Sequence, residues 1–149
     1  AGVLFFLAGM KFFLSHWKET STFDDDDKAW LRVMGGYLNK NAVVPPMGKY
    51  NTGQKIFGMT ALFGALAAMF TGVVLWNAAV LSPELVRISA LAHALCFVIL
   101  ATFFIAHLYL GAIGVAGSLG AMTSGSVSES WAKRHAPKWL AELKKAGKA

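Results

Sequence analysis

Charged residues and cysteine are both scarce in this chain of 149 residues. Lys, Arg, Asp and Glu make up only 15% of it, against about 25% in ordinary soluble domains, and 56% of it is hydrophobic. The single cysteine, Cys96, excludes an internal disulfide and a thiolate cluster for zinc or iron–sulfur. The net charge of +6 does not indicate nucleic-acid binding, because the charges bracket apolar segments. The composition therefore favours an integral membrane protein over a globular enzyme.

Three apolar segments predict transmembrane helices, at about residues 1–17, 56–76 and 85–115. The first is only marginally long enough, and it opens on Ala1 without an initiator Met or a signal-peptide layout. We therefore expect further residues to precede Ala1. The expected fold is all-α, an integral membrane helical bundle with about three of its transmembrane helices present.

Lys and Arg residues predict the orientation of these helices. Of 14 such residues, six lie in the loop 18–55 and six between Lys133 and Lys148, whereas only Arg87 flanks the short loop on the other side. Because cytoplasmic loops are rich in Lys and Arg, we expect the loop 18–55 and the C-terminus to be cytoplasmic. The chain then divides into a membrane domain, residues 1–125, and a cytoplasmic amphipathic tail, residues 126–149.

The polar regions carry two further features. The acidic run Asp24–Asp27 with Lys28 could be an engineered tag site, but a native loop is favoured, with the run as a solvated start to a short helix around residues 29–38. The tail predicts an amphipathic helix broken near Pro137, with His135 on its surface.

His93 and His107 are the most informative residues of the chain. They lie fourteen residues apart in one apolar segment, so a helix would place both rings on one face, roughly 21 Å apart along the axis. Ionisable side chains are costly inside a membrane and mark functional sites there. Two imidazoles at this spacing suit the irons of two haems stacked across the bilayer. The alternative is that each ring hydrogen-bonds a neighbouring helix.

Two haems with two axial ligands each need more histidines than these. His16 closes the first segment and could complete one haem, although a histidine at the membrane boundary is the preferred interpretation. The remaining ligands are expected ahead of Ala1.

A polar cluster, Lys49–Lys55, comes just before the second segment. Its Asn51 and Gln54 amides offer the donors and acceptors that quinone carbonyls require. The alternative, favoured by spacing alone, is a helix start with Asn51 as the N-cap.

The chain resembles the cytochrome b (gamma) subunit of respiratory formate dehydrogenase along nearly its whole length. The stretches that carry this resemblance are Gly48–Lys55, Thr71–Trp76, Val86–Arg87, Ala92–Ala94, Ile105–Tyr109, Gly117–Met122, Gly125–Ser128 and Trp131–His135. Their combined order is specific, whereas each stretch alone would be weak.

The resemblance implies four transmembrane helices, two b haems and reduction of menaquinone or ubiquinone near the cytoplasmic face. It implies that His93 ligates the outer haem iron and His107 the inner one. It also makes Asn51, Gly53 and Gln54 candidate quinone-site residues. The family's first helix and its histidine are absent here, and His16 matches a position that is not a haem ligand.

The expected function is therefore electron transport in anaerobic respiration, at the bacterial inner membrane. The subunit would pass electrons from a molybdenum or tungsten catalytic (alpha) subunit and an iron–sulfur (beta) subunit, through two haem b groups, to quinone. It would oxidise no formate itself. The alternatives are a cytochrome b subunit of a nickel–iron hydrogenase or sulfur-compound reductase, and a haem-free membrane anchor.

Overall fold

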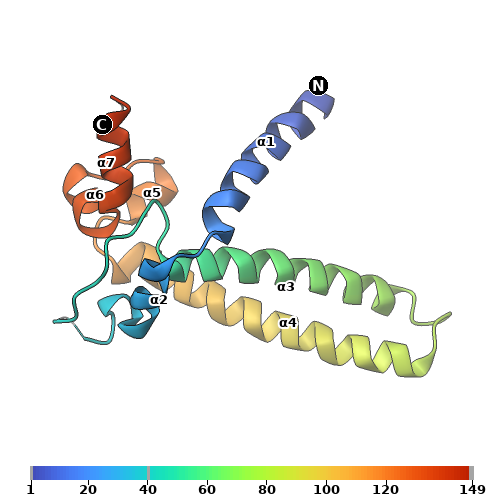
Figure 1. Ribbon diagram of the computed structural model, residues 1–149. Coiled ribbons are helices and arrows are strands. Elements are labelled where there is room, and N and C mark those ends of the chain that lie inside the picture. Colours follow the sequence, from blue (N-terminus) through green and yellow to red (C-terminus); the bar gives the residue numbers. More distant parts are fainter. Residues whose placement is uncertain (1, 40, 148–149) are drawn as a thin grey trace. The chain divides into compact units, whose positions relative to one another are not determined.

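The computed structural model describes residues 2–39 and 41–147, which form helices joined by loops (Figure 1). The helices are α1 (Gly2–Ser21), α2 (Asp25–Arg32), the short 3-10 turn η1 (Met34–Gly36), α3 (Thr52–Trp76), α4 (Pro83–Tyr109), the π-helical turn η2 (Leu110–Gly114), α5 (Leu119–Thr123), α6 (Glu129–His135) and α7 (Pro137–Lys145). The predicted all-α class is confirmed.

The chain divides into two compact units. One contains Ala1–Ile56 together with Gly120–Ala149, and the other contains Phe57–Leu119. Helix α3 begins in the first unit and continues through the second.

The second unit is an antiparallel pair made by α3 and α4 (Figure 1). Of the described helices, only Thr52–Trp76 and Pro83–Gly114 are long and apolar enough to cross a membrane, with mean hydropathies of 1.9 and 2.4. Ser82 begins α4 by accepting a hydrogen bond from the Leu85 N–H, and Pro83 occupies the first helical position. Few side chains of either helix are fully buried, as expected of a pair that faces lipid.

The first predicted segment also forms a helix, α1, but a less apolar one. Lys11 lies inside it, and Lys18 and Glu19 lie in its last turn. A membrane span at residues 1–17 therefore stays a prediction.

Asp27 is the central polar residue of the first unit. It is 1% exposed, and its carboxylate accepts hydrogen bonds from the Thr52 hydroxyl (2.8 Å), the Lys55 ammonium (2.7 Å) and the Asp24 N–H (2.9 Å). Asp24 returns a bond to the Asp27 N–H, which makes a reciprocal cap at the start of α2. These bonds join α2 to the first turn of α3.

The predicted short helix around residues 29–38 was wrong in position, since α2 covers Asp25–Arg32. The acidic run is also not fully solvated, because Asp27 is buried against Lys55, which lies 28 residues further along the chain.

The predicted break of the tail at Pro137 is confirmed, since α6 ends at His135 and α7 begins at Pro137. Helix α7 is held to the loop by Lys138, whose backbone N–H donates to the Met47 carbonyl (3.2 Å) and whose ammonium pairs with Asp26 and Asp24. The hydrogen bond to Asp26 raises the pKa of Lys138. The hydrogen bond from the Asp27 N–H, with the charge of Lys138, holds the pKa of Asp24 below its usual value.

Replacing Asp27 with Ala should open the start of α2 away from α3. The change leaves the Lys55 ammonium without its buried carboxylate, and breaking a buried pair in this way costs about 3–5 kcal/mol. Hydrogen exchange of the amides in α2 and the first turn of α3 measures this loss. Asp25→Ala is the matched control, because Asp25 pairs with Lys28 on the surface. Equal protection in the two variants would contradict the role of Asp27.

Candidate functional site

Three contacts between α3 and α4 follow one seven-residue repeat. His93 meets Thr71, Leu100 lies against Gly64, and His107 stacks on Phe57. Each step of seven residues forward along α4 therefore matches seven residues back along α3. Seven residues are close to two helical turns, so all three α4 side chains face α3. The prediction that the two histidines share one helix face is confirmed.

The His93 ring is oriented by Thr71. Its Nδ1 lies 2.9 Å from the Thr71 Oγ1, which also lies 2.8 Å from the Ala67 carbonyl oxygen. A hydroxyl has one proton, and the Ala67 carbonyl accepts it, so the Thr71 oxygen accepts the Nδ1–H of His93. This arrangement selects the neutral tautomer whose Nε2 carries a lone pair, the form that binds a metal.

An apolar cavity of about 470 Å³ lies beside this ring in the second unit. Its other lining residues are aromatic or aliphatic: Phe57, Ala61, Ala68, Phe97, Leu100, Ala101 and Phe104. A wall of this kind with one imidazole suits a flat, largely apolar ligand that carries a metal.

His107 is held differently. Its ring stacks on the Phe57 ring at 4.3 Å between centroids and 4° between planes. Among residues 2–39 and 41–147 no side-chain hydrogen bond reaches its nitrogens, so either nitrogen is available to a ligand. The ring is partly exposed at the edge of the helix pair.

The described part of the chain contains no group of three His, Cys, Asp or Glu side chains placed to hold a metal ion. A haem does not need such a group, because the porphyrin supplies the equatorial ligands and the protein supplies only axial ones. His93, with its oriented ring and apolar cavity, fits an axial ligand, and His107 has the required donor atom.

Asn51 and Gln54 form a reciprocal cap at the start of α3. The Asn51 Oδ1 accepts from the Gln54 N–H, and the Gln54 Oε1 accepts from the Asn51 N–H, both at 2.9 Å. The predicted N-cap at Asn51 is therefore present. The cap uses both amide oxygens and leaves the two NH2 groups, the donors that a quinone carbonyl would need.

Packing against Trp30 explains why position 53 is a glycine. A Cβ at this position would lie 2.9 Å from the Trp30 ring, so a larger residue would push α2 away from α3. Trp30 and Thr52 support the Asn51–Gln54 turn, and sequence reasoning missed both, as it missed Thr71 and Phe57.

His16 binds Tyr50, with 2.8 Å between its Nε2 and the Tyr50 hydroxyl oxygen. This bond occupies the nitrogen that an axial ligand most often uses. His135 is not fully on the surface as expected, because its ring packs on Trp131 at 4.8 Å. Its desolvation, with the charge of Arg134, lowers its pKa.

Comparisons with known proteins identify the family of this chain. The sequence model of the family described as prokaryotic cytochrome b561 matches residues 1–125. The chain is 36% identical over 127 residues to the cytochrome b556(Fdn) subunit of the nitrate-inducible formate dehydrogenase of Escherichia coli K12, which covers 83% of this chain and 58% of that protein.

Two further relatives carry similar names. The chain is 29% identical over 147 residues to the cytochrome b556(fdo) subunit of an E. coli K12 formate dehydrogenase, covering 97% of this chain and 68% of that protein. It is 30% identical over 145 residues to the cytochrome b556 subunit of a Haemophilus influenzae formate dehydrogenase, covering 95% and 60%. The chain thus spans less than two thirds of the length of the first of these relatives.

Thr71→Val should weaken haem binding at His93 while leaving His107 unaffected. Valine keeps the shape of threonine but cannot accept the Nδ1–H, and losing such a partner typically costs about 10- to 100-fold in metal affinity. Haem titration followed in the visible spectrum measures this change. Thr71→Ser keeps the hydroxyl and is the matched control. Equal affinity in the two variants would show that the hydrogen bond does not orient the ligand.

Proposed function

The chain belongs to the prokaryotic cytochrome b561 family, and from this we propose that it is the membrane cytochrome b subunit of a formate:quinone oxidoreductase complex. The observation that carries the proposal is the pair His93 and His107, both turned toward α3 and separated by four helical turns of one membrane-spanning segment. In this proposal His93 holds one haem b and His107 holds another.

Haem b, when bound, would supply one-electron transfer. The chain's own residues bind and orient it. Thr71 fixes the His93 tautomer, Phe57 covers one face of His107, and apolar side chains line the cavity beside His93. A hydrogen bond from His93 to a neighbouring helix is also what the haem-free alternative predicts, so the support for the haem comes from the family match together with the oriented ring, and not from this bond alone.

The electron acceptor in this proposal is menaquinone or ubiquinone, bound at the start of α3. Asn51 and Gln54 would donate N–H groups to a quinone carbonyl, while Gly53 allows the Trp30 ring to support the turn from behind. The cap and the quinone site use different atoms of the same side chains, so both roles are compatible.

The proposed partners are an iron–sulfur subunit and a molybdenum or tungsten catalytic subunit, which supply the electrons. The names of the three relatives favour formate over hydrogen or sulfur compounds as the source. We place residues 1–125 in a membrane haem-binding domain and residues 126–149 in a cytoplasmic tail.

The sidedness of the proposal has structural support. The loop 18–55 and the tail belong to one compact unit, joined by Lys138, which supports the proposal that both lie on the same side of the membrane. Together they carry most of the Lys and Arg residues, which supports the proposal that this side is the cytoplasm of a bacterial inner membrane.

Removing either histidine should remove one haem. In the purified complex, reduced-minus-oxidised spectra should show b-type α-bands, and His93→Ala and His107→Ala should each lose one component because each removes an axial nitrogen. His135→Ala, in the tail, is the control and should keep both. Two complete and unshifted haem signals in His93→Ala or His107→Ala would contradict the assignment. A wild-type complex without b-haem signals would favour a haem-free anchor.

Asn51→Asp separates the cap from the quinone site. Aspartate keeps the oxygen that caps α3 but has no N–H to donate, whereas Asn51→Ala loses both. We expect both variants to slow haem oxidation by quinone, since a lost hydrogen bond costs about 1 kcal/mol, or roughly fivefold. Only the alanine variant should lose a further 1 kcal/mol or so of helix stability. A normal rate in Asn51→Asp with a slow rate in Asn51→Ala would leave Asn51 as a cap alone.

A further inference from the structure

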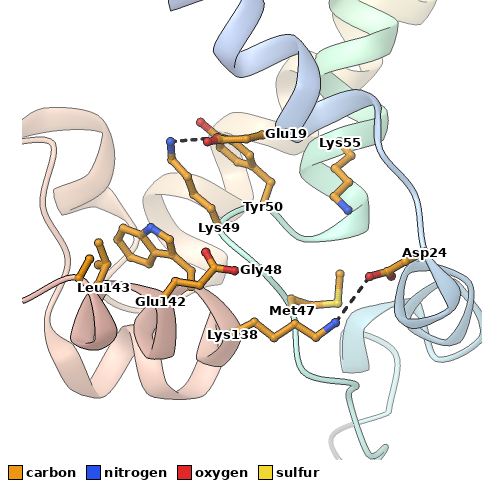
Figure 2. Close-up of a pocket in the computed structure, with 12 residues that line it drawn as sticks. Glu19, Asp24, Met47, Gly48, Lys49, Tyr50, Lys55, Lys138, Glu142 and Leu143 are labelled. Carbon is orange, nitrogen blue, oxygen red and sulfur yellow. Dashed lines mark hydrogen bonds and ion pairs between the residues drawn. The ribbon is translucent and has the colours of Figure 1, made fainter. Parts of the chain in front are cut away.

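A polar cavity of about 480 Å³ lies in the first unit, between the end of α1, loop residues 47–50 and α7 (Figure 2). The electron path proposed above does not use it. Glu19, Lys49 and Tyr50 come together on one side of the cavity, as Figure 2 shows. The side chains of Lys49 and Glu19 are 39% and 40% exposed, so water reaches this side.

Contacts run from Glu19 through Lys49 and Tyr50 to His16. The Lys49 Nζ lies 3.0 Å from the Glu19 carboxylate and 5.3 Å from the centre of the Tyr50 ring, and the Tyr50 hydroxyl lies 2.8 Å from the His16 Nε2. Partial burial alone would lower the pKa of Lys49, but the bond and charge of Glu19, with Tyr50, raise it. Lys49 is therefore a permanent cation beside the tyrosine.

We propose that Tyr50 and His16 form a proton donor for quinone, reloaded from the water of this cavity. The inference rests on the proposed function, because it assigns the source of the protons for the same quinone. Tyr50 directly precedes Asn51, so its backbone belongs to the turn whose amides would bind the quinone carbonyl, and its hydroxyl reaches His16. Tyr50 also lines the solvent-accessible cavity, so it links that cavity to the turn that holds Asn51 and Gln54.

The single contact between Tyr50 and His16 serves both stages of the reaction. In the loaded state His16 is an imidazolium, and its Nε2–H donates to the tyrosine oxygen. When the quinone oxygen takes the Tyr50 proton, the O–H bond of Tyr50 breaks, a new O–H bond forms on the quinone, and the Nε2 proton moves to the tyrosine oxygen. His16 is then neutral and accepts a hydrogen bond from Tyr50.

Reloading reverses the bond. A hydronium ion in the cavity gives a proton to the Tyr50 oxygen as the hydroxyl proton moves to the His16 Nε2, and the hydronium becomes water. The Lys49 ammonium offsets any negative charge on Tyr50 during both transfers. Two such cycles deliver two protons, which with two electrons from the formate-oxidising partner convert one quinone to quinol.

The hydrogen bond between His16 and Tyr50 could also serve only to hold α1 against the loop. The test therefore separates proton donation from this structural role. Tyr50→Phe keeps the ring against His16 and removes only the hydroxyl. His16→Gln keeps a hydrogen-bonding partner for Tyr50 but cannot store a proton. Tyr37→Phe, a hydroxyl removed from an exposed tyrosine of the same unit, is the control.

The experiment uses the complete complex in detergent and measures haem reduction by formate separately from haem oxidation by a soluble quinone, in H2O and D2O. Both test variants should slow oxidation by about 100-fold, the lower range for general acid–base groups, with normal haem spectra and normal reduction by formate. The solvent isotope effect should change in both.

A normal rate in Tyr50→Phe, or a normal rate and isotope effect in His16→Gln, would overturn the proton donor while the proposed function stands. A wild-type complex that holds no haem or does not oxidise quinol or reduce quinone would instead overturn the proposed function, and the proton donor with it.

Discussion

The facing helix is what orients a polar side chain in an apolar helix pair, because lipid offers no hydrogen-bonding partner. Helix α4 carries two imidazoles, and α3 supplies the partner of each, a hydroxyl for His93 and an aromatic face for His107. These two pairings fix the register of the helices. Between them, Gly64 leaves space for Leu100, because a Cβ there would lie only 2.8 Å from the leucine side chain. The placement of the two imidazoles and the packing of the helices therefore depend on the same seven-residue repeat.

A buried carboxylate makes the corresponding connection in the first unit. Asp27 is buried, and among the described residues its carboxylate accepts hydrogen bonds from the start of α2 and the first turn of α3. Removing the Asp27 carboxylate would leave the Lys55 ammonium without its partner. It would also loosen the contact between the Trp30 ring and Gly53. The turn that holds Asn51 and Gln54 is thus positioned by residues that touch no ligand themselves.

Sequence patterns predicted what repeats locally and missed what pairs over a distance. The shared face of His93 and His107 follows from helical periodicity alone, and the cap at Asn51 from its spacing to the helix start. Thr71 was missed because its role appears only once α3 is aligned against α4, although the short loop between them could have indicated the register. Asp27 was misjudged as solvated because an acidic run usually is, and its partner Lys55 lies far along the chain.

The two capped helices of the first unit show why the amides of α3 are informative. Helices α2 and α3 begin with the same reciprocal geometry, made by Asp24 and Asp27 in one and by Asn51 and Gln54 in the other. A carboxylate caps a helix as well as an amide does and also interacts favourably with the helix dipole, so capping alone would favour acids at both places. What the amides add is a pair of N–H2 donors next to a membrane-spanning helix, and a carbonyl ligand is the chemistry that would use them.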